Sequence, residues 1–532
     1  MGQFVNPDNE LFKRESTSEI YIDKTGLIRY TNHVFGSPQR MFICNSRPRR
    51  FGKSYAADML TAYYSKGCDS RDLFKDLDIG RDPDFEKHLN KCEVIRFDVQ
   101  WCISMAKDMG TDPIDYINQS IVADMKKEYP DFTFSDNLPA FGAMNEYSVK
   151  TGRRFVVIID EWDSIIRDRN NDEHLIDRYV DFLRGMFKGT EPMNYISLAY
   201  MTGILPIKRQ KTQSALNNFD EYTMLQAAQF EPYIGFTDEE VKSLCREYDM
   251  NYEEMKKWYD GYLLGDTQVY NPNSVCKCID RRKMGNYWTA TGSFAPVRDC
   301  LNMNFDGMKQ DIIDMLSGVG VKISTLTFEN RVDRSAFNSK NDVFTYMIHI
   351  GYLAYDEAKQ KAFIPNEEIR QVLGAEISES HWTEFDSFEK KSDELLDATI
   401  EGDSDAIATA ITKIHDRYAS AIWYNNENSL ASTINIAYLS TLKYYFRPVR
   451  EMPTGKGFAD VVYLPLPEYL SDIPALVIEL KWDKDVSTAM DQIRDRQYPE
   501  SIKDYTGDII LVGISYDKKT KEHTCIIDQT KI

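Results

Sequence analysis

The stretch Arg47–Ser54, with the sequence RPRRFGKS, constrains the fold of this chain most strongly. It lies between a short apolar run, Met41–Cys44, and an amphipathic segment that begins near Tyr55. This is the strand–loop–helix order that a phosphate-binding loop requires. One position departs from the common pattern G-x-x-x-x-G-K-[ST], because Arg47 stands where the first glycine is expected. Taken alone, the stretch is either a specialised phosphate-binding loop or a basic loop that resembles one by chance.

The last three residues of this stretch are those that phosphate chemistry needs. Gly52 lets the backbone approach a phosphate, and Lys53 can reach the β- and γ-phosphates of a nucleotide. The hydroxyl group of Ser54 can hold Mg²⁺. We therefore expect Gly52, Lys53 and Ser54 to bind a nucleotide, with Ser54 also serving as a metal ligand.

A nucleotide hydrolase also needs two acids, one for the Mg²⁺ shell and one to polarise the attacking water. Asp160 and Glu161 follow Phe155–Ile159, whose consecutive apolar residues are typical of a strand covered on both faces. We expect Asp160 to hold the metal and Glu161 to be catalytic, although an exposed acidic turn would have the same pattern. Thr202, at the end of the next expected strand, could contact the γ-phosphate or could be purely structural.

The chain is long enough for about three domains, and its patterns divide it into residues 1–230, 231–384 and 385–532. Strands alternating with helices predict an α/β fold with a parallel sheet in the first part. In the second part, a helix ending at Gly351 and two short strands suit a winged-helix-like adapter or another small α/β linker. The third part predicts a separate α/β domain with the order α-β-β-α-β.

Composition limits the classes of function. Lysine and arginine number 64 against 84 acidic residues, which gives a formal charge of −20. Such a surface repels a polyanion, so contact with nucleic acid would need a local basic groove or metal ions. The nine scattered cysteines favour a reducing compartment. Since no signal segment or membrane-length apolar run is present, we expect a cytoplasmic protein without a membrane partner.

A second set of chemical residues lies near the C-terminus. Asp460 precedes Glu479 and Lys481, which are two residues apart on an expected strand and therefore face the same side. Phosphodiester hydrolysis needs carboxylates that hold metal ions and a lysine that orients the attacking water. An ion pair on a surface strand would give the same sequence pattern. However, the segment 475–480 is apolar enough to be an interior strand, and charges inside such a strand need a reason.

Residues about 5–300 resemble the AAA-ATPase-like domain family. The shared motifs, in order, are YIDKT at 21–25, RPRRFGKS at 47–54, IIDE at 158–161, MTGIL at 201–205, GFTDEEV at 235–241, YDGY at 259–262, VYNP at 269–272, YW at 287–288 and TG at 291–292. The resemblance implies ATP and Mg²⁺ as cofactors. It also implies that arginine in place of the first glycine, as at Arg47, is usual in this family. In this context, we expect Arg47, Arg49 and Arg50 to supplement the backbone at the phosphates. The resemblance leaves ATP turnover open.

Residues about 385–532 resemble the PD-(D/E)XK nuclease superfamily, through GKGFAD at 455–460, IELK at 478–481, and Gln492 with Tyr498. In that resemblance, Asp460 and Glu479 are ligands of Mg²⁺ or Mn²⁺ and Lys481 is the catalytic lysine. Gln492 would support the site, and Glu427 would match an additional acid on the preceding helix. This part of the fold would be restriction-endonuclease-like.

The sequence therefore predicts an ATP-binding, hydrolysing P-loop module that controls a metal-dependent nuclease. The partner would be nucleic acid, with DNA favoured over RNA, and self-association into a homo-oligomer stays open. One alternative is a nucleotide-switched regulatory protein of a defence or mobile-element system, whose nuclease-like domain recognises without cutting. Another is an ATPase that acts on protein partners.

Overall fold

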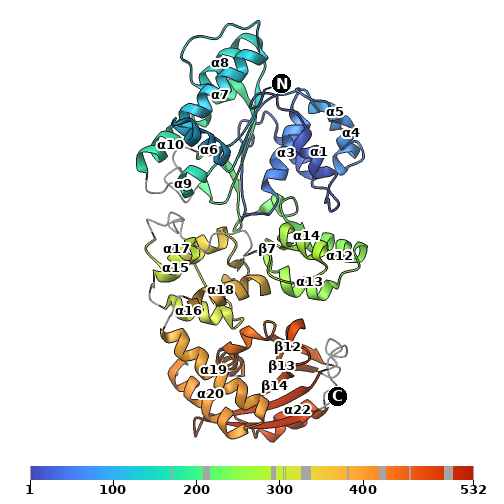
Figure 1. Cartoon of the computed structure of the whole chain (residues 1–532), viewed down its shortest axis with the longest axis vertical. Coiled ribbons are helices and arrows are strands. Elements are labelled where there is room, and N and C mark those ends of the chain that lie inside the picture. The colour runs from blue at the N-terminus through green and yellow to red at the C-terminus, as the bar shows by residue number, and fades with distance from the viewer. Residues whose placement is uncertain are drawn as a thin grey trace. The chain divides into compact units, whose positions relative to one another are not determined.

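The computed structural model describes residues 2–168, 172–207, 216–288, 295–303, 305, 307–324, 337–379, 383–418, 427–454, 457–495 and 507–530. The chain forms two compact units (Figure 1). Unit 1 comprises Met1–Met284 and Ile323–Gln360, and unit 2 comprises Gly285–Lys322 and Lys361–Ile532. The segment that the sequence assigns to an adapter is divided between the two units. The boundaries of the three expected domains remain a prediction.

Unit 1 contains a five-stranded parallel sheet with the order β2-β3-β4-β1-β5. Its strands are β1 (Phe42–Ser46), β2 (Glu93–Asp98), β3 (Phe155–Asp160), β4 (Ile196–Gly203) and β5 (Asp220–Tyr222). Viewed nearly edge-on in Figure 1, this sheet lies between two helical layers, one with α1 and α3 and the other with α6, α7 and α10. The predicted α/β architecture of this part is confirmed.

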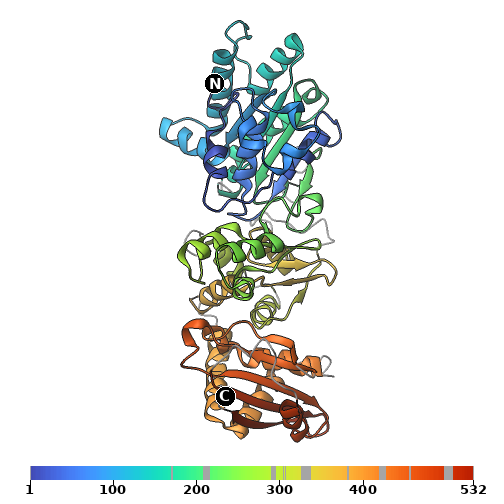
Figure 2. The same ribbon diagram turned by 90° about the vertical axis from the view of Figure 1, so that its right-hand side faces the viewer.

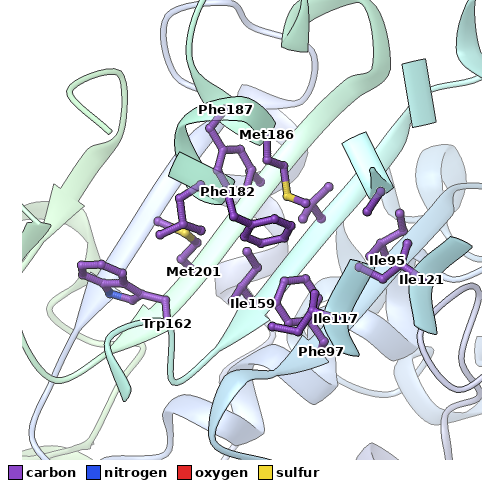
Figure 3. Packing of buried hydrophobic residues seen from close by; sticks show 14 of the residues in the cluster. Ile95, Phe97, Ile117, Ile121, Ile159, Trp162, Phe182, Met186, Phe187 and Met201 are labelled. Carbon is purple, nitrogen blue, oxygen red and sulfur yellow. The ribbon is translucent and has the colours of Figure 1, made fainter. Parts of the chain in front are cut away.

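The helices of this layered part are α1 (Glu10–Ser16), α2 (Gly26–Val34), α3 (Lys53–Tyr64), α4 (Arg71–Phe74), α5 (Phe85–His88), α6 (Val99–Met109), α7 (Pro113–Glu128), α8 (Ala140–Thr151), α9 (Ser164–Asp168), α10 (Glu173–Phe187) and α11 (Pro192–Tyr195). Figure 3 shows side chains from both a helical layer and the sheet meeting in one core, with Phe97 and Ile159 of the sheet beside Ile117 and Phe182 of the helices. All six residues of β3 are buried. Coverage on both faces explains its continuous apolar sequence.

A smaller lobe completes unit 1. It holds the three-stranded sheet β6-β8-β7 and several helices. Its elements are β6 (Phe236–Thr237), α12 (Asp238–Glu247), α13 (Tyr252–Tyr259), β7 (Tyr262–Leu264), β8 (Thr267–Tyr270), α14 (Pro272–Arg281), α17 (Lys340–His349) and β10 (Ala354–Asp356). Helix α17 and strand β10 correspond to the helix and first strand expected around Gly351, and β11 (Lys361–Phe363) to the second.

Unit 2 is built on a second five-stranded sheet with the order β12-β13-β14-β15-β16, in which only β14 and β15 run parallel (Figure 2). The strands are β12 (Val449–Thr454), β13 (Gly457–Tyr463), β14 (Ala475–Trp482), β15 (Ile509–Asp517) and β16 (Glu522–Thr530). The helices are α15 (Ala295–Asn302), α16 (Met308–Leu316), α18 (Glu367–Glu379), α19 (Thr383–Glu401), α20 (Ser404–Tyr418), α21 (Glu427–Ala437) and α22 (Ser487–Asp495), and β9 (Val321–Lys322) pairs with β11.

The predicted order α-β-β-α-β for this domain was incomplete, because β12 and β16 form the two edges of the sheet. Strand β12 contains Pro453, which an edge strand tolerates but which weakens a strand pattern in the sequence. The expected helix over residues 429–446 ends at Ala437 and is followed by a 3₁₀ turn, Leu439–Lys443. Among the helices of the described ranges, none is long and apolar enough to cross a membrane.

Candidate functional site

The loop after β1 lies at the carboxyl ends of the neighbouring strands β1 and β4, from which the chain continues toward opposite edges of the sheet. Strand β1 leads to the edge strand β2, whereas β4 leads to β5 on the other side of β1. In open α/β sheets, ligands bind outside the carboxyl ends of the strands at such a point. Gly52, with a φ of 89°, precedes the first residue of α3, and Arg50 also has a positive φ of 68°. The loop therefore turns sharply and directs the N-terminus of α3 toward the carboxyl edge of the sheet.

Lys53 is a buried cation at the end of this loop. Its side chain is 4% exposed, and its Nζ donates a hydrogen bond to Pro48 O at 3.0 Å. The same Nζ lies 4.0 Å from Glu161 Oε1. Burial lowers the pKa of Lys53, and Glu161 is the first of the nearby carboxylates that oppose this effect. An anionic phosphate would supply the compensating charge that the buried ammonium group needs.

The acids at the end of β3 meet Thr202 of β4. Thr202 Oγ1 donates a hydrogen bond to Asp160 Oδ1, and Glu161 N donates to the same oxygen at 3.0 Å. Asp160 is 1% exposed. Burial raises the pKa of Glu161, while the cations Lys53 and Arg167 act to lower it. The structure thus brings together four of the expected residues, Lys53, Asp160, Glu161 and Thr202.

Ser54 and the loop arginines occupy different environments. Ser54 is exposed in the first turn of α3, and Arg49 is exposed while Arg50 is half-buried. Arg47 is completely buried, and its Nη1 donates to Ser46 O at 3.0 Å and to Tyr222 O at 3.1 Å. Burial lowers the pKa of Arg47 to about 10. These contacts tie Arg47 to strands β1 and β5, while its role at phosphates remains a prediction.

Phe51 is a residue of the loop that sequence reasoning missed. It is 1% exposed, and its ring packs edge-on against Tyr262 with 5.2 Å between ring centroids. A Cβ added to Gly235 would lie 3.2 Å from Phe51 Cδ1. The smaller lobe of unit 1 therefore holds the loop through residues of the GFTDEEV and YDGY motifs. Two features of the sequence could have pointed to Phe51. It is an apolar residue within a basic loop, and the chain also contains the two motifs that contact it.

The second group of expected residues gathers on β13 and β14. Leu480 N donates a hydrogen bond to Asp460 Oδ2 at 2.7 Å, which places that carboxylate beside β14. Lys481 Nζ lies 3.3 Å from Glu479 Oε1 and 3.1 Å from Leu480 O. Glu479 is 1% exposed and Lys481 is 7% exposed. A carboxylate pair and a lysine thus lie close together in a largely buried setting.

Helix α22, which carries Gln492, covers the same face of the sheet as Glu479. Gly513 of β15 is the partner of Glu479 in the parallel register, so the two residues face the same side. A Cβ on Gly513 would lie 3.2 Å from Ala489 Cβ of α22. The side chain of Gln492 lies outside the described part of the structure.

Helix α21, which begins at Glu427, packs against the opposite face. Tyr463 of β13 pairs with Leu476 and donates a hydrogen bond to Asn435 Oδ1 of α21 at 3.2 Å. Leu476 alternates with Glu479 along β14 and therefore faces the other side. The side chain of Glu427 also lies outside the described residues, so its place in the site remains a prediction.

Both groups supply the ligands that Mg²⁺ prefers, which are carboxylate, hydroxyl and carbonyl oxygens. At the first group these are Ser54 Oγ and Asp160, and at the second they are Asp460 and Glu479. The buried carboxylates of Asp160 and Glu479 fit a cation, because a buried negative charge needs a positive partner. Within the described ranges, no group of three or more His, Cys, Asp or Glu side chains forms a metal cluster.

Two family models match the chain. Residues 11–212 match the family described as a predicted AAA-ATPase, and residues 425–524 match a family of the PD-(D/E)XK nuclease superfamily. Both resemblances identified from motifs are therefore confirmed.

Two individual proteins are also similar. One from Azotobacter chroococcum mcd 1, named an uncharacterized protein in the vnfD 5′ region, is 23% identical over 539 residues and covers 96% of this chain and 95% of that protein. The solved structure of the Aeropyrum pernix ORC2 protein in its ADPNP-ADP complexes aligns with a TM-score of 0.26 and 10% identity, over 69% of this chain and 98% of that one. At that TM-score, no argument about fold or function follows. From the family models, the chain carries a domain of the predicted AAA-ATPase family over residues 11–212 and a domain of the PD-(D/E)XK nuclease superfamily over residues 425–524.

Proposed function

We propose that this chain binds and hydrolyses ATP in its first domain and uses that cycle to control a metal-dependent nuclease in its second. The observation that carries the proposal is the placement of Asp460, Glu479 and Lys481 beside one another, with both Glu479 and Lys481 buried. Domains of these two families generally use a nucleotide and a divalent metal ion. The substrate is nucleic acid, with DNA favoured, and the protein is cytoplasmic.

In the ATP site, each residue has a distinct role. Lys53 binds the β- and γ-phosphates, Ser54 and Asp160 hold Mg²⁺, and Thr202 orients Asp160 through its hydroxyl group. Glu161 accepts a proton from the water that attacks the γ-phosphorus. As the new oxygen–phosphorus bond forms, the bond from the γ-phosphorus to the β,γ-bridging oxygen breaks, and ADP and phosphate leave. A Mg²⁺ ion held by Ser54 and Asp160 would supply charge that stabilises the phosphate oxygens.

In the nuclease site, Asp460 and Glu479 would hold a divalent metal ion, which would lower the pKa of a bound water molecule. Lys481 holds the attacking water and stabilises negative charge on the scissile phosphate. Its Nζ already lies 3.3 Å from Glu479 Oε1, so the lysine is confined to the neighbourhood of the metal ligands. Gln492 of α22 would support the proposed site from the face of the sheet that carries Glu479. Glu427 is the first residue of α21, which packs on the opposite face, so it would have to join the site from the end of that helix.

The direct test is cleavage of DNA and RNA by the full chain with Mg²⁺ or Mn²⁺, comparing the unmodified protein with Lys481→Ala. We expect the variant to lose about 100-fold or more of the cleavage rate, since removing one group that stabilises charge in the transition state typically costs at least that factor. Lys484→Ala is a matched control, because Lys484 is exposed just after the same strand. Equal cutting by the unmodified protein and Lys481→Ala would contradict the site assignment.

Control by ATP is tested in the same assay with and without nucleotide. We expect ATP to change the cleavage rate of the unmodified protein and to have little effect on Lys53→Ala at the same concentration, because that variant binds ATP far more weakly. If ATP does not change the cleavage rate of either protein, the proposed control by ATP is contradicted, whereas the assignment of the nuclease site is not affected.

The alternative function, nucleotide-switched recognition without cutting, is favoured by the net charge of −20, which gives no general attraction for nucleic acid. It predicts ATP-dependent binding of nucleic acid by the full chain with no cleavage under any metal. Binding that is equally strong in Lys481→Ala would accompany that result.

A further inference from the structure

We propose that Arg167 is a positioning residue for ATP hydrolysis, which holds one carboxylate oxygen of Glu161 so that the other faces the nucleotide. This inference rests on the proposed function of the first domain. Neither the Arg-rich loop nor the acid pair at the end of β3 identifies Arg167 in the sequence. Its contacts with Glu161, Asp163 and Ser164 form within the turn after β3, and Asp163 in turn is held by the turn after β4.

Arg167 lies in the short helix α9 and is 10% exposed. Its Nη1 lies 3.2 Å from Glu161 Oε2 and 3.1 Å from Asp163 Oδ1. Its Nη2 donates a hydrogen bond to Ser164 Oγ at 3.2 Å. The planar guanidinium group is therefore held at several points, and it offers Glu161 a cation whose direction is fixed.

Asp163 anchors this arginine to the end of β4. It is completely buried, and its Oδ2 accepts hydrogen bonds from Ile204 N at 3.2 Å and Leu205 N at 2.9 Å. Its other oxygen faces Arg167. Asp163 thus joins the MTGIL turn after β4 to the guanidinium group that holds Glu161.

Gly203 allows this turn to approach so closely. A Cβ at position 203 would lie 2.5 Å from Trp162 Nε1 and 2.9 Å from Asp163 Oδ1, distances that real Cβ atoms do not adopt. Trp162 N also donates a hydrogen bond to Thr202 O at 2.9 Å. The turn after β3 and the turn after β4 are therefore locked together, which is the supporting arrangement that a preorganised catalytic group requires.

Glu161 itself is held in an unusual conformation. Its φ of 52° lies in the left-handed region, which a non-glycine residue adopts only when the surroundings impose it. Its two oxygens have different neighbours, with Lys53 Nζ 4.0 Å from Oε1 and Arg167 Nη1 3.2 Å from Oε2. Phosphates that bind Lys53 would leave Oε1 to accept the proton of the attacking water, while Oε2 stays with Arg167.

The test measures ATP hydrolysis and ATP binding by the full chain with Mg²⁺ and nucleic acid present. The variants are Arg167→Met, Arg167→Lys, Glu161→Gln and the double variant Glu161→Gln/Arg167→Met. We expect Arg167→Met to lower kcat about tenfold with the Kd for ATP changed less than about twofold, because the arginine acts on the base and not on the nucleotide. Arg167→Lys should recover part of the lost kcat, since lysine keeps the positive charge but lacks the planar set of N–H donors of the guanidinium group.

The double variant separates positioning from general structure. If Arg167 acts through Glu161, then Arg167→Met should cause no further loss in a protein that already carries Glu161→Gln. Arg184→Met is the matched control, because Arg184 is exposed on α10 and pairs with Asp181 of the same helix. Its kcat should equal that of the unmodified protein.

Three results would overturn the inference. They are an unchanged or raised kcat in Arg167→Met, losses that add in full in the double variant, and a weakening of ATP binding as large as the loss of kcat. If the unmodified protein binds ATP without hydrolysing it, both the inference and the hydrolysis step of the proposed function fail. If the protein hydrolyses ATP but substitution of Arg167 does not change the rate, only the inference is contradicted and the proposed function is not.

Discussion

Each of the two domains buries a lysine beside a glutamate, but the two pairs are built differently. Lys53 is 4% exposed and lies 4.0 Å from Glu161, which belongs to a segment more than a hundred residues away. Lys481 is 7% exposed and lies 3.3 Å from Glu479, two residues earlier on the same strand. The first pair depends on the order of strands in a sheet, whereas the second depends only on the alternation of side chains along one strand.

This difference has a chemical consequence. Glu161 contacts a second cation, Arg167, whose position is set by Asp163 and the turn after β4. A base assembled from separate segments can be tuned by each of them. The nuclease triad, by contrast, gains its geometry from one hairpin, β13 and β14, and from the hydrogen bond between Leu480 N and Asp460 Oδ2. We therefore expect distant substitutions to affect ATP hydrolysis more readily than phosphodiester cleavage.

The largest expected effect is that of Lys53→Met on ATP binding. The variant loses a charge-assisted contact to the phosphates worth about 3 kcal/mol, so its affinity for ATP should fall about 100-fold. Without nucleotide, the same variant should be more stable than the unmodified protein. Burial lowers the pKa of Lys53, so below that folded pKa the native state carries the full cost of an ionised buried lysine. This cost disappears as the pH rises toward the pKa of the unfolded chain.

Isothermal titration with ATP and thermal unfolding measure the two parts of this prediction. Lys75→Met is the control, because Lys75 is exposed and pairs with Asp72 on the surface. Unchanged ATP affinity in Lys53→Met would contradict the assignment of the loop. Arg47→Gly should retain measurable ATP binding if Arg47 only replaces a glycine, and a loss equal to that of Lys53→Ala would make Arg47 a phosphate ligand.

The next effect is the loss of stability in Gly203→Ala. The added Cβ would lie 2.5 Å from Trp162 Nε1, so the turns after β3 and β4 must separate, at a cost of about 2 kcal/mol. Urea unfolding followed by circular dichroism measures this change. Gly374→Ala is the matched control, since no described atom beyond its chain neighbours and the backbone of its own helix lies within 4 Å of a Cβ at this position of α18. That variant should be neutral or slightly stabilised, and an equal loss in both variants would contradict the close packing at Gly203.

The smallest effect concerns Glu15 of α1, a carboxyl near the ATP site. Burial, and next the charge of Asp58, raise the pKa of Glu15 from 4.5 to about 8. Below pH 4.5 the group is protonated in both states, but between that pH and about 8 the unfolded chain ionises while the native state keeps its proton. The stability of the unmodified protein should therefore fall across this window relative to Glu15→Gln.

We expect a difference of about 1 kcal/mol, reduced by solvent because Glu15 is only partly buried. Denaturant unfolding at about pH 5 and about pH 8.5 measures it. Glu10→Gln is the control, since Glu10 is exposed at the start of the same helix. A stability difference between Glu15→Gln and the unmodified protein that is the same at both pH values would contradict the burial of this carboxyl.

The sequence by itself determined the features that depend on neighbours along the chain. Periodicity predicted the buried strand β3, and alternation placed Glu479 and Lys481 on one face, because side chains two apart on a strand point the same way. Motifs identified both families and the loop that ends at Ser54. Strands β12 and β16 escaped prediction because edge strands bury less apolar surface and carry a weaker pattern.

Only the tertiary structure decided which distant residues meet. It brought Lys53, Glu161 and Thr202 to one edge of the sheet, because parallel strands β1, β3 and β4 end side by side. The order β2-β3-β4-β1-β5 that makes them neighbours has no counterpart in local patterns. The link from Gly203 through Asp163 to Arg167 is likewise visible only in space, because its cause is the close packing of two turns, and packing depends on which segments are neighbours in the folded chain.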